Sequence, residues 1–336
     1  MKGSVLKKFL CTCLVTAAAF AATTISASAC TTIYVGGDLV EEGTPFVART
    51  EDYGSDYNKL WFISESGKWK QGDHYVGCPE YGPFEWDFTH DSYRFTYFTN
   101  DIYYDGICPE CGEKADHYSY TEFGTNEKGV SVSATETLHG NAKVTEVDPY
   151  RDADWAKESN SERIGIEETD IPTIILAEAS SAREGVKLLL DIYENYGCVA
   201  ASGVFVCDKD EVWYVENCSG TQYVAIKLND NMIFLEPNMA VIGRVDLDDE
   251  NVIASKDLIA VAKKAGTFVG DEAKNIIDFR ASYARISEKM DQRMIDGLNY
   301  LNATYKYDSD ALVADNTKFT ISNLDASDKL VALYTN

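Results

Sequence analysis

The feature that most constrains this chain is Cys30, which directly follows a segment typical of secretory signals. Three lysines lie near the start of the chain, and the apolar run Phe9–Ala22 that follows is too short to span a bilayer comfortably. Ala27-Ser28-Ala29 has the small-residue pattern of a cleavage site. We therefore expect residues 1–29 to be a signal peptide and Cys30 to be the first residue of the mature chain.

A mature chain that begins with cysteine carries a thiol and a free α-amine on one residue. The reference pKa of an α-amine is about 7.7–8.0, so near neutral pH it can take the thiol proton, directly or through water. This chemistry makes Cys30 the first candidate for a catalytic nucleophile. A structural cysteine ranks second. A lipoprotein anchor, in which Cys30 is acylated, ranks third because Ala27 stands where bacterial lipoprotein signals usually have leucine.

Charge narrows the choice of partner. The chain has 30 basic and 55 acidic residues, and loss of residues 1–29 with their three lysines moves the net charge from −25 to −28. This excess of acid disfavours nucleic acid and anionic lipid as partners. No second apolar stretch is long enough to cross a membrane. We expect a secreted bacterial protein without membrane contact after cleavage, or a cell-surface lipoprotein if Cys30 is acylated. Residues 30–336 suit one large domain or two small ones.

Seven cysteines follow residue 29, an odd number, so at least one is unpaired if the others form disulfides. Cys108-Pro109-Glu110-Cys111 has the spacing of half a structural zinc site, and Cys78 could add a third ligand. A histidine could supply the fourth: His74, His90 or His117. The same spacing suits a small disulfide loop. We expect neither arrangement to take part in the chemistry.

The residues after Cys30 predict a hairpin. Thr31–Val35 is β-branched or aromatic, which is strand composition, and Pro45–Asp52 forms a second strand that ends in charge. Strands joined by a short connection pair with each other, and this pairing brings Arg49 and Asp52 back towards Cys30. The alternative for Arg49 and Asp52 is a surface ion pair that closes a strand.

Periodicity and turn residues predict the other elements. Two successive strand pairs are expected at Gly203–Cys207 with Glu211–Glu216 and at Thr221–Leu228 with Met232–Leu235. Helices are expected at Ser181–Tyr196, Val252–Lys264 and Phe279–Leu301. We interpret residues 66–120, rich in aromatic residues, glycine and proline, as an insertion or loop region that faces substrate. Asn238 lies at a strand end, where an amide could donate to a developing oxyanion or simply form a turn.

Several of these segments resemble the dipeptidase A family of N-terminal-nucleophile hydrolases, relatives of choloylglycine hydrolase and penicillin V acylase. The most specific are Cys30-Thr31-Thr32-Ile33 and the stretch Gly124–Val130 that leads into Ser133–Thr137. Segments that match more weakly follow in the family's order: Ala48–Asp52, Asp170–Thr173, Ala182–Val186, Glu211–Glu216, Ser219-Gly220 and Asp246–Asp249.

The resemblance implies an α+β fold, an αββα sandwich with two antiparallel sheets between helical layers. It implies hydrolysis of an amide bond without a metal or other cofactor. By position, the implied site residues are Cys30 (nucleophile, with its amine as base), Arg49 (near the thiol), Asp52 (holding the amine), Asn238 (oxyanion donor), Glu136 (oxyanion donor through its backbone N–H) and Arg285 (a further polar contact).

The expected function is therefore that of a secreted cysteine dipeptidase. Cys30 would attack the peptide carbonyl of a dipeptide, an acyl-enzyme would form, and water would release it. The same site would also suit an amidase of the choloylglycine hydrolase or penicillin acylase type. A hypothesis from another class is a lipid-anchored binding protein without catalysis.

Overall fold

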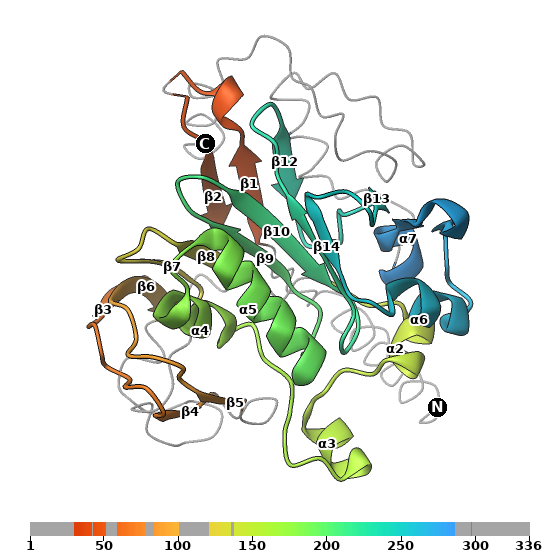
Figure 1. The fold of residues 1–336 in the computed structure, drawn as a ribbon, viewed down its shortest axis with the longest axis horizontal. Coiled ribbons are helices and arrows are strands. Elements are labelled where there is room, and N and C mark those ends of the chain that lie inside the picture. The colour runs from red at the N-terminus through yellow and green to blue at the C-terminus, as the bar shows by residue number, and fades with distance from the viewer. Residues whose placement is uncertain are drawn as a thin grey trace, which may run out of the picture.

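Two antiparallel sheets lie face to face in the computed structural model, which describes residues 30–41, 43–51, 59–77, 84–100, 121–135, 138–285 and 297 (Figure 1). The smaller sheet consists, in spatial order, of β12 (Ile233–Glu236), β1 (Thr31–Val35) and β2 (Phe46–Thr50). The larger sheet consists, in spatial order, of β14 (Val252–Ala254), β11 (Tyr223–Lys227), β10 (Val212–Asn217), β9 (Gly203–Cys207), β8 (Ser131–Thr135), β7 (Phe123–Asn126), β6 (Phe95–Asn100) and β3 (Lys59–Ser64).

The hairpin predicted after Cys30 is confirmed as β1 and β2. Thr32 pairs with Arg49, and Tyr34 pairs with Val47. The 3₁₀ helix η1 (Gly37–Leu39) lies in the connection. The second predicted hairpin is confirmed as β9 and β10.

The predicted pairing of Thr221–Leu228 with Met232–Leu235 is wrong. β11 pairs with β10 and β14 in the large sheet, whereas β12 pairs with β1 in the small sheet. The connecting turn is bound by the small sheet, because the Gly36 N–H donates to Met232 O and the Asp38 N–H donates to Asp230 O, both over 2.9 Å. The chain therefore passes from one sheet to the other at a point that has the sequence of a tight hairpin.

Aromatic side chains from both sheets meet in the space between them. The ring centroid of Tyr214 in the large sheet lies 4.7 Å from that of Phe205 and 4.9 Å from that of Phe234 in the small sheet. Because side chains alternate along a strand, Thr32, Tyr34 and Phe234 share the inner face of the small sheet. Burial of these rings provides much of the core.

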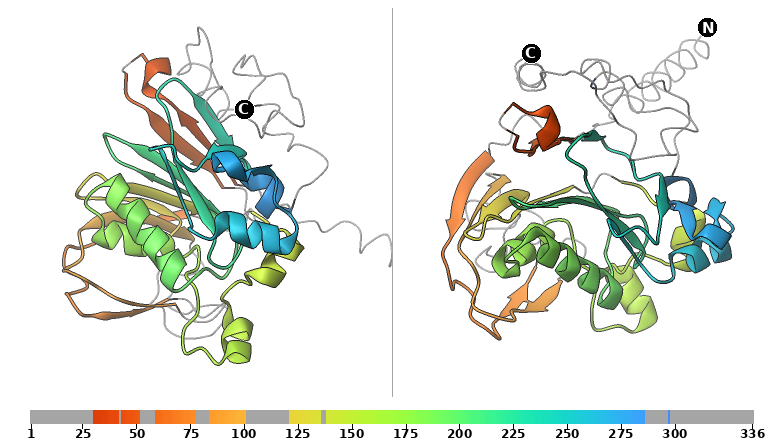
Figure 2. Two further views of the ribbon diagram at one scale, coloured as in Figure 1. Left: turned by 45° about the vertical axis from the view of Figure 1, so that its right-hand side comes forward. Right: turned by 45° about the horizontal axis from the view of Figure 1, so that its top comes forward.

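Helices cover the opposite face of the large sheet. They are α4 (Ile171–Glu178) and α5 (Ala182–Asn195), and Figure 2 shows them on the side away from β1 and β2. The α5 helix matches its prediction, with Ser181 Oγ as the N-cap acceptor and Gly197 in a left-handed conformation after its end. Gly297, a helical residue, lies against Leu235 on the outer face of the small sheet. The predicted α+β class with two antiparallel sheets is confirmed.

Smaller elements complete the described chain. They are α2 (Ala142–Val147), α3 (Ala153–Ser159), α6 (Leu258–Ala265), α7 (Phe279–Tyr283), η4 (Glu272–Lys274), β4 (His74–Val76), β5 (Glu85–Asp87), β13 (Arg244–Asp246), β15 (Gly270–Asp271) and β16 (Ile276–Asp278).

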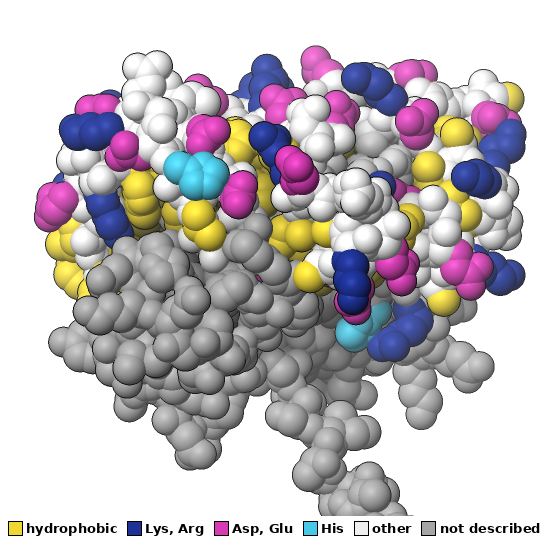
Figure 3. Space-filling model, turned by 90° about the horizontal axis from the view of Figure 1, so that it is seen from below, with side chains coloured by type: hydrophobic (Ala, Val, Ile, Leu, Met, Phe, Trp, Pro, Cys, Tyr) yellow, Lys and Arg dark blue, Asp and Glu magenta, His cyan; other side chains and the backbone are white. Residues whose placement is uncertain are grey.

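No helix within the described ranges is long and apolar enough to cross a membrane. Figure 3 shows acidic and basic side chains interspersed over one face, with hydrophobic patches between them.

Three predictions about elements require correction. The helix predicted from Val252 begins instead with strand β14, because those residues pair with β11, and α6 starts only at Leu258. The helix predicted at Phe279–Leu301 is interrupted after Tyr283, because Ala284 forms a bridge to Gly140; of its later residues from 286 on, the structure describes Gly297, which is helical. The 66–120 region is not only loop, since β6 within it is an integral strand between β3 and β7.

Candidate active site

Cys30 lies at the end of the space between the sheets and is only 7% exposed. It precedes β1, in which Thr31 pairs with Thr50 and Thr32 pairs with Glu236. Extended past the strand ends, these two registers place Cys30 between Glu51 on one side and Asn238 on the other. The fold thus brings the three segments predicted to carry the site together at one end of the strands of the small sheet.

Arg49 reaches from the small sheet to the large sheet. Its Nη2 lies 3.6 Å from Cys30 Sγ. Its Nη1 donates to the backbone oxygens of Ala134, over 2.7 Å, and Glu122, over 3.2 Å, and to Ser133 Oγ over 3.3 Å. A planar guanidinium held by acceptors on two sides has little freedom to turn away from the thiol.

Arg49 keeps its charge although it is half-buried between the sheets. Burial alone would lower the pKa of Arg49, but the negative charges that Cys30, Glu168, Glu122 and Glu51 carry when ionised outweigh burial and raise it. A fixed cation beside a cysteine favours the thiolate, which is the nucleophilic form. The local electrostatics therefore suit a reactive thiol at Cys30.

A second cation lies beside this cluster. The ammonium of Lys59, at the start of β3, contacts the carboxyl groups of both Glu51 and Glu122, whose side chains are 16% and 2% exposed. Burial, and then contact with Glu51, raises the pKa of Glu122 to about 8. Burial alone would raise the pKa of Glu51, but hydrogen bonds from Glu122 and Lys59 outweigh burial and lower it. Near neutral pH, Glu51 is therefore ionised and Glu122 holds a proton.

The segment that carries Asn238 is tied to the large sheet by a buried carboxyl group. Asn238 is half-buried. A few residues later, Glu216 of β10 accepts from the N–H of Val241 over 2.6 Å and from that of Ile242 over 3.1 Å. Tyr214 also donates its hydroxyl to Glu216 over 3.0 Å. Burial raises the pKa of Glu216 to about 7, although these N–H donors oppose the rise.

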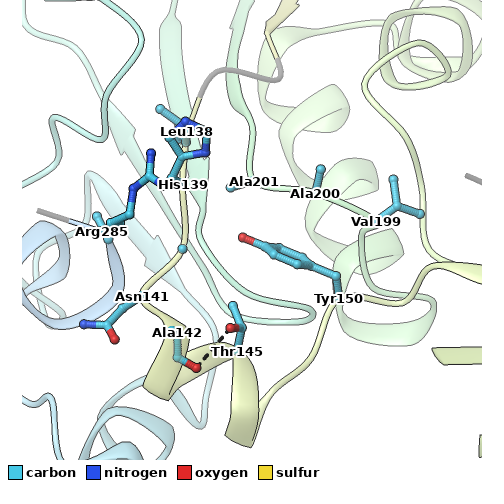
Figure 4. A pocket seen from close by; sticks show the side chains of 12 residues that line it. Leu138, His139, Asn141, Ala142, Thr145, Tyr150, Val199, Ala200, Ala201 and Arg285 are labelled. Atoms are coloured by element: carbon cyan, nitrogen blue, oxygen red, sulfur yellow. Dashed lines mark hydrogen bonds between the residues drawn. The ribbon is translucent and has the colours of Figure 1, made fainter. Parts of the chain in front are cut away.

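Arg285 lies in a neighbouring cavity of about 760 Å³ rather than in the cluster around Arg49. Its backbone N–H donates to His139 O over 2.7 Å. Figure 4 shows the side chains of Arg285 and His139 close together on one wall, with Tyr150 across from them. Burial, and then the charge of Arg285, lowers the pKa of His139, so a neutral imidazole stands beside the guanidinium.

Several predicted site residues lie outside the described ranges. They are Asp52, Glu136, His117 and the cysteines Cys78, Cys108 and Cys111. Of the histidines proposed to complete a zinc site, His74 contacts Asp87 over 2.7 Å, and both ring nitrogens of His90 contact backbone oxygens. The roles of Asp52 and Glu136, and the zinc and disulfide alternatives, stay predictions.

The structure adds residues that the sequence did not point to. Glu122, Lys59 and Glu168 come from separate segments, and no local pattern links them to Cys30. Glu216 had a recognisable signal, because it is an acidic residue inside the otherwise apolar strand Val212-Trp213-Tyr214-Val215. A charged residue at a strand position that should be buried indicates a specific partner.

Comparison with known proteins identifies the family. Residues 29–308 match peptidase family C69, so the chain belongs to that family, the dipeptidase family that its motifs resemble. A protein of Streptococcus pyogenes serotype M6 named probable dipeptidase B is 32% identical over 304 residues, which cover 89% of this chain and 55% of that protein. A probable dipeptidase of Salmonella dublin is 31% identical over 262 residues, 76% of this chain and 53% of that protein.

The chain spans about half the length of the curated relatives it matches. Among solved structures, penicillin V acylase from Agrobacterium tumefaciens is similar with 16% identity and a TM-score of 0.35, over 62% of this chain and 49% of that one.

Proposed function

We propose that this chain is a cysteine hydrolase that cleaves the peptide bond of dipeptides, with Cys30 as the nucleophile after removal of residues 1–29. The observation that carries the proposal is the buried thiol of Cys30, 3.6 Å from the fixed guanidinium of Arg49 at the start of a central strand. The family match begins at residue 29, and the relatives are named as probable dipeptidases.

The chemistry follows from these positions. Cleavage after Ala29 would expose the α-amine of Cys30, which takes the proton from Sγ. Arg49 stabilises the resulting thiolate, which attacks the carbonyl carbon of the substrate. The negative oxygen of the tetrahedral intermediate takes a hydrogen bond from the amide of Asn238 and from the backbone N–H of Glu136.

The intermediate then collapses and the peptide C–N bond breaks. The α-ammonium of Cys30 gives its proton to the leaving amine, and the acyl group stays on Sγ. Water, deprotonated by the same α-amine, attacks the thioester and frees the acid. In this scheme Asp52 holds the α-amine, and Arg285 in the neighbouring cavity is a further polar contact for substrate.

We also propose that the protein is secreted through residues 1–29. The lipoprotein alternative acylates Cys30 and blocks its amine, so it excludes the mechanism above. The two are separated by the intact mass of the protein exported from a bacterial host, together with peptide mapping of its N-terminus. A chain that starts at unmodified Cys30 supports the proposal, whereas a lipid on Cys30 or a different start contradicts it.

The decisive variant is Cys30→Ala. We expect dipeptide turnover to fall by about four orders of magnitude or more, because the proposed acyl-enzyme forms on the thiol of Cys30. Cys207→Ala is the matched control: this thiol is half-buried on β9, and burial, followed by the charge of Asp208, raises its pKa to about 11.

The substrate panel contains dipeptides, a glycine-conjugated bile acid and penicillin V. Activity only on the last two would replace the dipeptidase proposal with the amidase alternative. Full dipeptide turnover by Cys30→Ala would overturn the nucleophile assignment.

A further inference from the structure

Among the described residues the two sheets differ in width, so part of the inner face of the large sheet has no strand of the small sheet opposite it. The small sheet has three strands and ends at β2, whereas the large sheet has eight. Arg49 of β2 hydrogen bonds with Ser133 and Ala134 of β8, which shows that the edge of the small sheet lies over β8. Strands β7, β6 and β3 follow β8 in the large sheet and extend beyond that edge (Figure 2).

Aromatic side chains form a row across these three strands. Trp61 pairs with Phe98 and Phe98 pairs with Phe123, so their side chains point to the same face. The rings of Phe98 and Phe123 are stacked with centroids 4.5 Å apart. We call Trp61, Phe98 and Phe123 the aromatic row.

The aromatic row is on the inner face, the same side as the candidate nucleophile. Phe123 pairs with Ser133, and Ser133 pairs with Phe205, whose ring packs against Phe234 of the small sheet. Ser133 Oγ accepts from Arg49, and the other end of that guanidinium contacts Cys30. The row therefore begins one strand away from the Arg49–Cys30 pair.

The aromatic row is exposed where large apolar side chains are normally buried. Trp61 is 53% exposed and Phe123 is 38% exposed. With Ile63, also on β3, they make up three of the four large hydrophobic residues that are exposed in the described part of the chain; the fourth is Val269. A concentrated apolar surface of this kind indicates a binding site.

The size of this surface suits a small ligand. Partly exposed aromatic side chains of this number present on the order of 300 Å² of apolar area. A stable protein–protein interface buries roughly 800 Å² on each partner, so a second copy of the chain would find too little surface here. One side chain of a dipeptide has an appropriate area.

We propose that the aromatic row is a subsite that holds an apolar, preferably aromatic, side chain of the dipeptide while Cys30 attacks its peptide bond. The inference rests on the proposed function. Ring stacking and removal of apolar area from water would favour such substrates over small ones. Lys59, two residues before Trp61, and its partner Glu51 lie at the polar border of the subsite.

The test compares matched substrates in the processed full chain. The kcat/KM values for Phe-Ala and Ala-Phe are divided by that for Ala-Ala, since either substrate residue could occupy the row. In Phe123→Ala and Trp61→Ala we expect the preference for the aromatic dipeptide to fall by about tenfold, mainly through KM. Trp61→Phe should restore most of it. Val269→Ala removes an apolar side chain of similar exposure elsewhere and should leave the ratio unchanged.

Each outcome has one meaning. An equal loss for all three dipeptides would overturn the subsite and make the aromatic row a structural feature. An unchanged preference would overturn it too, as would a change of oligomeric state in Trp61→Ala without a change in preference. Failure of the wild-type protein to cleave any dipeptide would instead overturn the proposed function, and the subsite with it. Thermal melting of each variant confirms that the folded enzyme is being compared.

Discussion

Two neighbouring rows of residues on the inner face of the small sheet have opposite chemistry. One row is Val47, Tyr34 and Phe234, which are paired across β2, β1 and β12. The next row, two residues along each strand, is Arg49, Thr32 and Glu236. The first packs against rings of the large sheet, whereas the second faces Cys30 and the buried carboxyl groups.

The apolar row stabilises the fold, whereas the charged row lowers its stability. Burial of rings between sheets is favourable in proportion to the apolar area removed from water. Burial of charges is costly unless each is paired, and replacing them with apolar residues is often neutral or stabilising. A charged row one step from an apolar row is therefore a sign of function, because packing alone would favour the apolar row in both places.

Removal of a ring from the apolar row should affect stability far more than chemistry. Phe234→Ala should lower the free energy of unfolding by about 3–5 kcal/mol, through lost burial and the cavity left beside Tyr214. Urea denaturation measures this loss. The kcat of the remaining folded enzyme should stay within about threefold of the wild type, because Phe234 touches no proposed reacting group. A loss of kcat under conditions where the variant is fully folded would show that the two rows are not separate in function.

Arg49→Lys tests the charged row. We expect kcat/KM to fall by about 10²–10³, or roughly 2.7–4 kcal/mol, because a lysine ammonium cannot span Cys30, Ala134 and Ser133 as the guanidinium does. The rate at which iodoacetamide alkylates Cys30 should fall as well, since less of the thiol would be ionised. Stability should change much less than in Phe234→Ala.

Arg183→Lys is the matched control for Arg49→Lys, since Arg183 is a half-exposed arginine paired with Glu211. Its kcat/KM should equal that of the wild type. Equal losses in the two variants would mean that Arg49 has no special relation to Cys30.

The β1–β2 hairpin could be predicted from sequence because it is local, whereas the pairing of β1 with β12 that completes the apolar row is not. β-branched and aromatic residues on either side of a short connection determine that β1 and β2 pair, and the pairing then places Arg49 beside Cys30. The family motifs added the fold class, which composition could not supply. The local sequence predicted wrongly that β11 pairs with β12. Asn229-Asp230-Asn231 has the composition of a hairpin turn, and this composition does not show to which sheet the following strand belongs.

The groups that surround Arg49 of the charged row could not be predicted, because they meet only in the folded chain. Glu122 and Lys59 are 63 residues apart; Glu122 directly precedes β7, and Lys59 begins β3. Each alone has the sequence context of an ordinary surface residue beside a strand. Their importance comes from the overlap of β2 with β8, which depends on how two sheets pack and not on any segment.

The smallest effect we predict is a change in how stability depends on pH when Glu122 is replaced by Gln. The pKa of Glu122 is about 8 in the folded protein, and the ordinary value of 4.5 applies when the chain is unfolded. Between these pH values the folded state binds more protons than the unfolded state. Glu122 therefore makes the free energy of unfolding fall as pH rises through this window.

Glu51 contributes the opposite slope, but at lower pH. Its pKa is lowered in the folded protein, so its contribution is present above the ordinary carboxyl range and is lost as pH falls through its folded pKa. Above about pH 5.5 the slope from this pair therefore comes from Glu122. Glutamine cannot ionise, so Glu122→Gln should remove that slope and leave the Lys59–Glu51 ion pair in place.

Urea denaturation of both proteins at about pH 5.5 and about pH 8 measures the effect, and the wild type should lose more stability than Glu122→Gln over this interval. Glu65→Gln, at a carboxyl group that is 75% exposed, is the control and should follow the wild type. Parallel curves for the wild type and Glu122→Gln would mean that Glu122 is ionised in the folded state at both pH values. The residues around Arg49 would then carry one more negative charge than they do with a protonated Glu122. Burial of the charged row would accordingly lower the free energy of unfolding by more than we infer.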